Sequence, residues 1–105
     1  MAHKLPANLS LLGDTNYLAW VSSMQYVLQS NKVWQLVSGS QKQPTKDKAA
    51  MEEWESKEEM AAGLIQLAIE PAQCVHIAKM MTDPVKIWET LKDVHFQQQI
   101  GRAHV

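Results

Sequence analysis

Apolar side chains recur at helical spacing in several separate stretches of this chain. In the first stretch, five of them fall on one face of a helix: Tyr17, Trp20, Val21, Met24 and Leu28. Asn16 or Thr15 precedes them and is suited to cap the helix by accepting a hydrogen bond from a free backbone N–H. The pattern therefore predicts an amphipathic helix that reaches about Leu28.

Two further helices are expected in the middle of the chain. A short one over residues 32–37 should stop at Gly39, because glycine adopts a left-handed conformation at little cost. Asp47 or Thr45 can open a longer one that reaches about Ile69. One stripe of this longer helix is apolar and should face the core: Ala50, Trp54, Ala61, Leu64, Ile65 and Ala68.

Prolines mark the start of the last two predicted helices, because the missing N–H of proline would have no partner in a first turn. After Pro71, one face carries Cys74, Ile77, Ala78 and Met81. The helix that begins at Pro84 should run to about Phe96 and aim four side chains inward: Ile87, Trp88, Leu91 and Val94.

These five helices, with no convincing strand, predict an all-α fold, a compact orthogonal bundle. Residues 1–14 lack periodicity and should form an extended N-terminal arm, whose apolar side chains can lie against the bundle: Leu5, Leu9, Leu11 and Leu12. The inward set expected to carry the fold is Trp20, Met24, Trp34, Trp54, Leu64, Trp88 and Leu91. The alternative for any one tryptophan, an exposed ring that stacks on nucleic-acid bases, is disfavoured on apolar stripes.

Composition and charge exclude several classes of function. The chain has 105 residues, room for one domain, with ten basic and eleven acidic side chains and a net charge of -1. Such a segment lacks the positive field that holds a phosphate backbone, so by itself it should bind nucleic acid poorly. A single cysteine excludes an internal disulfide, and no apolar run is long enough for a membrane span. We therefore expect a soluble, cytoplasmic protein without membrane partners.

The chemically versatile side chains do not converge on a site. Cys74 and His76 are two residues apart, so on a helix they point away from each other and cannot coordinate the same zinc ion. His95 lies near the expected end of the last helix, where interaction with the helix dipole explains it. Asp14 has no obvious chemical partner. We therefore expect no enzyme activity, no catalytic residue, no metal ligand, no cofactor and no small-molecule substrate.

The C-terminal residues suggest a non-native tail. Residues 100–105 are those that a common short-read sequencing adapter would encode if it were read in frame. We therefore assign residues 98–105 to such a tail and expect the natural chain to continue beyond about Gln99. A genuine polar tail is the alternative.

With these patterns in place, about residues 5–97 resemble the N-terminal capsid region of a copia-type long-terminal-repeat retrotransposon Gag polyprotein. The resemblance is carried by Leu12, Gly13, Asn16, Tyr17, Trp20, Met24, Leu28, Val33, Trp34, Val37, Gly39, Trp54, Pro84, Ile87, Trp88 and Leu91. It implies that residues 15–97 form a capsid-like helical domain truncated at its C-terminal side. Such a domain associates with other Gag subunits into a shell around the element's RNA, without catalysis.

The resemblance also implies how RNA would be bound. In this family the nucleic-acid-binding zinc knuckle commonly lies later in Gag, so RNA contact is expected only through regions absent from this chain. Two alternatives stay open. One is a helical adaptor that a host has retained for protein–protein interaction, and the other is a small enzyme or RNA-binding domain with an unrecognised site.

Overall fold

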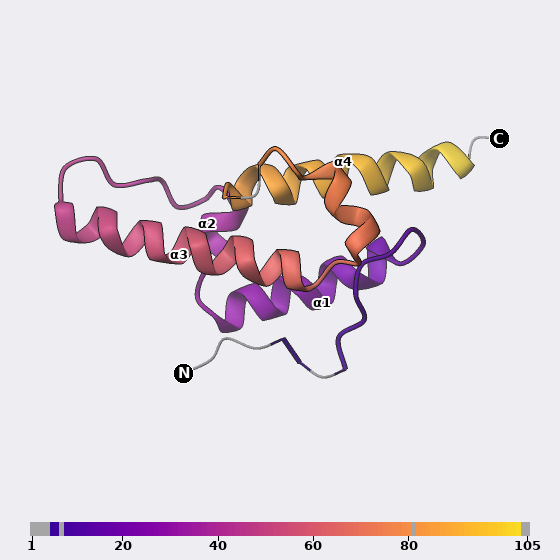
Figure 1. The fold of residues 1–105 in the computed structure, drawn as a ribbon, viewed down its shortest axis with the longest axis horizontal. Helices are drawn as coiled ribbons and strands as arrows, with labels where there is room; N and C mark the ends of the chain where they lie inside the picture. The colour runs from indigo at the N-terminus through magenta and orange to yellow at the C-terminus, as the bar shows by residue number, and fades with distance from the viewer. Residues whose placement is uncertain (1–4, 7, 81, 104–105) are drawn as a thin grey trace.

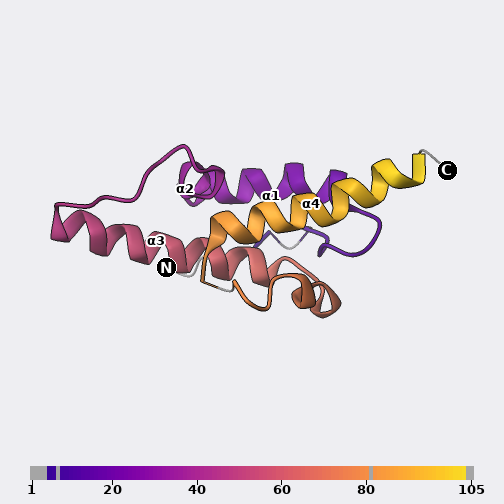
Figure 2. The ribbon, with the colours of Figure 1, turned by 90° about the horizontal axis from the view of Figure 1, so that it is seen from above.

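The computed structural model describes residues 5–6, 8–80 and 82–103, with side chains as far as Phe96. In these residues the chain forms α1 (Tyr17–Ser30), α2 (Trp34–Ser38), α3 (Lys48–Leu67), the 3-10 helix η1 (Pro71–His76) and α4 (Pro84–Ala103). The long helices α1, α3 and α4 run lengthwise, with α1 opposite in direction to the other two, whereas α2 and η1 lie crosswise (Figure 1; Figure 2). The prediction of an all-α fold with five helices is confirmed, since the described residues form no strand.

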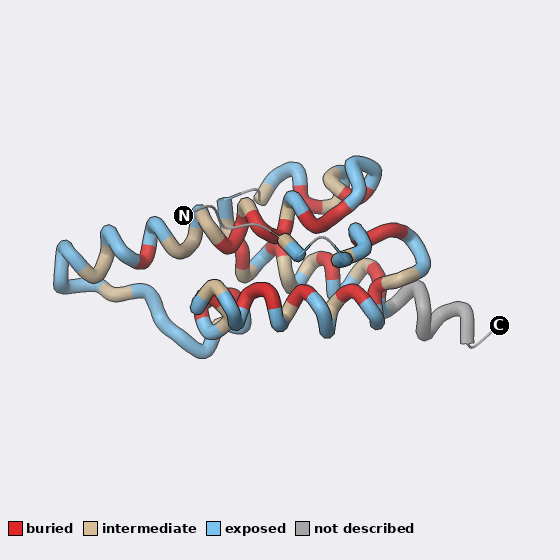
Figure 3. The backbone as a smooth tube through the Cα atoms, turned by 90° about the horizontal axis from the view of Figure 1, so that it is seen from below, coloured by how far each residue is buried: buried red, intermediate tan, exposed pale blue. Residues whose placement is uncertain are grey.

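The core lies where the three long helices overlap. Buried segments of each helix face one another there, while the N-terminal part of α3 and the loop before it are mostly exposed (Figure 3). Each of the four α-helices contributes large side chains that are almost fully buried: Met24, Leu28, Leu36, Ile65, Ile87 and Leu91. The apolar stripes predicted for α1 and α3 therefore face inward, although Ala50 of α3 is only partly buried.

The ends of α2 and α3 follow the predicted chemistry. α2 ends at Gly39, whose φ of 84° lies in the left-handed region that glycine favours. Asp47 caps α3, because its side chain accepts a hydrogen bond from the Ala49 N–H at 3.0 Å. On the outer face of α3, the Lys57 ammonium lies 3.4 Å from the Glu53 carboxylate.

The predicted cap of α1 is wrong. Asn16 stands at the N-cap position, but neither it nor Thr15 makes a side-chain capping hydrogen bond. Instead Asn16 Oδ1 accepts a hydrogen bond from the Gly13 N–H at 2.7 Å, and its Nδ2 donates to the Leu11 carbonyl at 2.9 Å. The amide holds the loop before the helix, so it is not available to the first turn.

The N-terminal arm is joined to the end of α3 by backbone hydrogen bonds. The Leu12 N–H donates to the Ala68 carbonyl at 2.9 Å, and the Glu70 N–H donates to the Leu12 carbonyl at 3.0 Å. Leu12 and Ile69 thereby form an isolated parallel bridge, and the Leu12 side chain is fully buried. Leu5 and Leu9 pack against the core with partial burial, whereas Leu11 is exposed.

The segment after Pro71 differs from the prediction. It is a 3-10 helix rather than an α-helix, and its buried side chain is Gln73. Ile77 is buried and Cys74 partly buried, as expected, but Ala78 is exposed and Met81 lies outside the described residues.

The last helix also differs from the prediction. α4 passes the expected end at Phe96 and continues to Ala103. Its inward set is largely confirmed, because Ile87 and Leu91 are fully buried while Trp88 and Val94 are partly buried. α4 therefore includes residues 98–103. A helical backbone is compatible with both a non-native tail and a genuine one. The assignment of residues 98–105 to a non-native tail stays a prediction.

Candidate interaction surface

An aromatic group links the helices. The Trp20 ring of α1 lies 5.7 Å from the Trp88 ring of α4, which lies 5.4 Å from the Trp34 ring of α2 in an edge-to-face arrangement. The Trp20 indole N–H also donates to the Ala68 carbonyl, at the end of α3, at 2.9 Å. These three tryptophans therefore connect all four α-helices.

Trp54 stands apart from that group. It is 7% exposed on α3, and its indole nitrogen is buried without a well-formed hydrogen bond. The carboxylate of Glu58, one turn along α3, is close enough for the indole N–H to lower the Glu58 pKa. Burial of Glu58 is the larger effect, and together with repulsion from Asp83 and Glu55 it leaves this pKa raised.

The residues that carry the family resemblance build the body of the molecule rather than an exposed site. Those that are buried are Leu12, Gly13, Tyr17, Trp20, Met24, Leu28, Val33, Val37, Trp54, Pro84, Ile87 and Leu91. Leu64, of the predicted inward set, is buried as well. Those that are partly buried are Asn16, Trp34, Gly39 and Trp88. A surface for a partner must therefore be formed by other residues.

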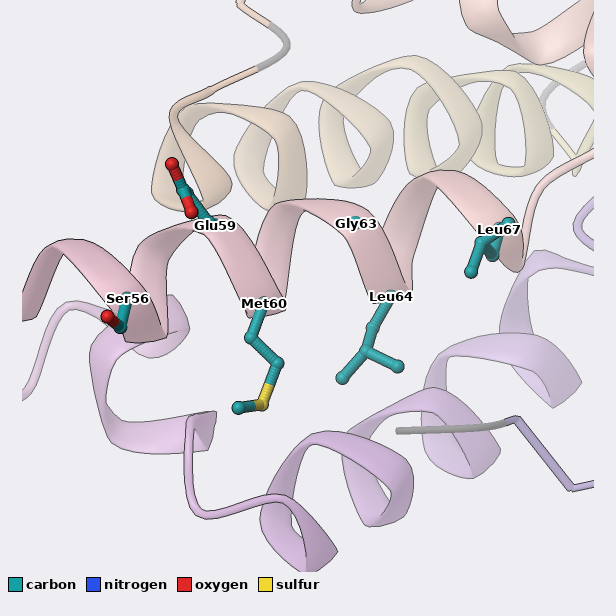
Figure 4. Close-up of a pocket in the computed structure, with 6 residues that line it drawn as sticks. All are labelled: Ser56, Glu59, Met60, Gly63, Leu64 and Leu67. Atoms are coloured by element: carbon teal, nitrogen blue, oxygen red, sulfur yellow. The ribbon is translucent and has the colours of Figure 1, made fainter. Parts of the chain in front are cut away.

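A hollow on the described surface runs along α3. It has a volume of about 490 Å³ and is lined by Ser56, Glu59, Met60, Gly63, Leu64 and Leu67. Met60 and Leu64 point from α3 toward the side where the purple ribbon of α1 lies, whereas Glu59 points to the opposite side of α3 (Figure 4). The space over Gly63 is open, and Leu67 is 66% exposed. The hollow can accept an apolar side chain or a helix face.

Other exposed apolar side chains are distributed over several elements. Leu18 and Tyr26 lie on α1, Val75 on η1 and Phe96 on α4. Tyr26 lines a smaller hollow of about 260 Å³ beside Pro6 of the arm. Single exposed apolar residues are common on protein surfaces, whereas the α3 hollow groups Met60, Leu64 and Leu67 along one helix.

A polar group connects η1 to α4 and to the loop before α1. His95 of α4 is 2% exposed, and its Nε2 lies 2.7 Å from Oε1 of Gln73, which is equally buried. Nε2 of Gln73 donates to the Asp14 carboxylate at 2.8 Å. The His95 ring is stacked on Tyr17, with centroids 5.5 Å apart, and meets the edge of His76 at 6.1 Å.

This group corrects two predictions. His95 does not lie at a helix C-terminus, because α4 continues to Ala103, so the helix-dipole explanation is wrong. Asp14 does have a partner, Gln73, which is 59 residues away in the sequence. Neither fact has a local signal in the sequence, since apolar periodicity does not report which polar side chains meet.

Burial shifts the pKa of two members of this group. The pKa of His95 is lowered by burial and by His76, against an opposing effect of Asp14. Burial, followed by the charge of Asp93, raises the pKa of Tyr17 to about 12. Both shifts favour the uncharged side chain, as expected in a poorly solvated environment.

Cys74 and His76 are both partly buried on η1. Within the described part of the chain, no three side chains of the metal-ligating types are grouped to hold an ion. No helix in that part combines the length and the apolar character needed to cross a membrane.

Comparison with known proteins indicates a family. A sequence model of the protein family described as the gag-polypeptide of LTR copia-type matches residues 24–104. This match begins within α1 and includes α2, α3, η1 and α4, whereas the Leu12–Trp20 cluster lies before it. No curated protein and no solved structure matches the chain.

Proposed function

The chain belongs to the gag-polypeptide family of LTR copia-type elements, and from that premise we propose that its copies associate into a particle shell around the element's RNA. The observation that carries the proposal is the family match over residues 24–104, most of the chain. Gag polypeptides are a structural class of protein, so the chain is a structural Gag segment. We propose that it acts by protein–protein contact alone, without catalysis.

The fold supports this role because a shell subunit must be rigid. A closed shell sums many weak contacts, and each contact is useful only if the subunit presents it in a fixed geometry. Here Trp20, Trp34 and Trp88 connect the helices, and the arm is hydrogen-bonded to the end of α3.

The proposed contact with RNA is indirect. The net charge of -1 gives this segment little attraction for phosphates, so RNA would be bound by other parts of Gag. The partners of this segment would then be other Gag subunits.

Sedimentation velocity of the purified full chain over a wide range of concentrations tests self-association. We expect the weight-average mass to rise with concentration, and electron microscopy to show particles or oligomers when the chain is extended through its natural locus. A strictly monomeric chain in both forms would contradict the proposal and favour the host-retained adaptor.

Two matched variants test whether the α3 hollow takes part. Leu67→Glu places a charge at the edge of the hollow, and Leu18→Glu places the same charge on α1, at a side chain that is also well exposed. If subunits meet at the hollow, Leu67→Glu weakens association while Leu18→Glu leaves it unchanged. The opposite result would place the contact on α1, and circular dichroism confirms that both variants are folded.

A further inference from the structure

The buried polar group around His95 joins three parts of the chain. Gln73 and His76 come from η1, His95 from α4, and Asp14 and Tyr17 from the loop before α1 and the first residue of α1. The core elsewhere is apolar, and among the described residues His95 and Gln73 are its buried polar members. A buried histidine is a candidate pH-sensitive group, because a second proton on its ring would place a charge in the core.

The chemistry of these side chains fixes which atom donates and which accepts in each hydrogen bond of this group. A carboxylate only accepts hydrogen bonds, so the contact with Asp14 orients the Gln73 amide with its nitrogen toward Asp14 and Oε1 toward His95. Oε1 also only accepts, and therefore His95 Nε2 carries the proton that it shares with Gln73. The uncharged ring of His95 therefore already donates a hydrogen bond to Oε1 of Gln73.

A second proton on His95 would create a buried charge. The groups that face the ring are Tyr17 at the start of α1, His76 on η1, and Asp14, which acts through Gln73. Asp93, on α4 itself, acts on Tyr17. Among these groups Asp14 favours the charged ring, but burial and His76 oppose it and prevail.

η1 is the element that can move away when this charge forms on His95. It is a six-residue 3-10 helix, and its buried side chain is Gln73, the partner of His95. A short 3-10 segment has weaker internal hydrogen bonds than an α-helix, so it depends on contacts with its neighbours. Moving η1 away would admit water to His95, whereas the ring contacts among Trp20, Trp34 and Trp88 involve no residue of η1.

We propose that η1 is an acid-released cap on α4, which detaches when the buried His95 ring takes up a second proton. This behaviour goes beyond the proposed shell function and does not depend on it, because it concerns contacts within one chain. The consequence of acidification is a local opening at η1 rather than unfolding of the bundle.

The sign of the effect follows from the direction of the pKa shift. In the folded chain the His95 pKa lies below its ordinary value of 6.5, so the open form binds the proton more readily than the closed form. Closure is therefore complete above pH 6.5 and is lost progressively as the pH falls below that value toward the pKa of the closed form.

Amide hydrogen exchange of the full chain tests the proposal at about pH 7.5 and about pH 5.5, after correction for the intrinsic pH dependence of exchange. The reporter is the Ile77 N–H, which donates to the Cys74 carbonyl, and the reference is the Val37 N–H, which donates to Val33 in α2. We expect protection at Ile77 to fall several-fold on acidification while protection at Val37 is unchanged.

Two variants identify the titrating group. His95→Gln keeps a donor for Gln73 but does not titrate, so protection at Ile77 should become independent of pH. His76→Gln removes a neighbour that lowers the His95 pKa, so the fall should remain and its midpoint should move to higher pH.

Three outcomes would overturn the proposal: no fall at Ile77, an equal fall at Val37, or the same fall in His95→Gln. A measurement on the unmodified chain covers the case in which His95→Gln does not fold. There the midpoint of the exchange change must coincide with the midpoint at which the His95 ring titrates by NMR, and a mismatch would also overturn the proposal.

Discussion

At the scale of single residues, two buried tryptophans on neighbouring helices have different environments. The indole N–H of Trp20 donates a hydrogen bond to the Ala68 carbonyl, and its ring lies 5.7 Å from the Trp88 ring in a tilted arrangement. Trp54 is buried nearly as deeply, but its N–H lacks a well-formed hydrogen bond. We therefore expect the two side chains, although similarly buried, to contribute unequally to stability.

Replacing each ring by phenylalanine measures this difference. Trp20→Phe loses volume, ring contact and a hydrogen bond, and should lower the free energy of unfolding by about 2–3 kcal/mol. Trp54→Phe loses similar volume but also removes a poorly paired N–H, so its cost should be smaller. Urea denaturation at neutral pH provides both values, and an equal cost would contradict this account.

Tyr17 makes the stability of the fold sensitive to alkaline pH. Its pKa is raised from 10.0 to about 12, so the folded chain holds the phenol proton where the unfolded chain has lost it. Stability should therefore fall as the pH rises through this window. Tyr17→Phe should remove that fall in alkaline urea denaturation, whereas Tyr26→Phe, at an exposed ring of the same helix, should leave it in place.

The sequence predicts residue burial well where the environment is apolar. Met24, Leu28, Ile87 and Leu91 follow helical spacing and are all buried. The environment of His95 could not be predicted, because Gln73, Asp14 and Tyr17 reach it from distant parts of the chain. Polar contacts at long sequence separation have no periodic signal.

At the scale of elements, the helix ends show where local chemistry is sufficient. Gly39 and Asp47 end α2 and begin α3 as their residue types suggest. Asn16 has a suitable residue type but bonds to the preceding loop, and the helix at Pro71 takes 3-10 form around a buried Gln73. In both cases a tertiary contact overrides the local preference, so the sequence alone could not reveal the outcome.

The turn after α1 contains a strained residue. Lys32 has a φ of 62°, in the left-handed region that costs a residue with a Cβ roughly 1 kcal/mol. Lys32→Gly should therefore stabilise the chain by about 0.5–1 kcal/mol in thermal or urea unfolding.

Gly39→Ala is the matched control for this prediction. It places a Cβ at a φ of 84°, where the surrounding space is open, so only backbone strain changes. It should destabilise the chain by a similar amount, and the same sign for both variants would contradict the explanation.

At the scale of the whole molecule, the N-terminal arm is held against the end of α3 by contacts of Leu12. Leu12 is fully buried and its backbone bonds to both Ala68 and Glu70, whereas its neighbour Leu11 is 42% exposed. The sequence predicted an extended arm of apolar character, but the register of Leu12 against Ile69 required the structure, because two segments 57 residues apart (69 − 12) meet there.

The adjacent residues Leu11 and Leu12 provide a test of how much the contact between the arm and α3 stabilises the fold. Leu12→Ala should lower the free energy of unfolding by about 2–5 kcal/mol, the range for a buried leucine, while Leu11→Ala should change it by less than about 0.5 kcal/mol. Equal effects in urea denaturation would show that the arm contributes little to the fold.

The long connection between α2 and α3 lies largely in solvent and away from the buried core (Figure 3). Exposed loop tips tolerate inserted sequence far better than helices do. An epitope or small binding peptide placed between Lys42 and Gln43 should therefore leave the bundle intact. If copies of the chain build a shell, this position offers a site for multivalent display.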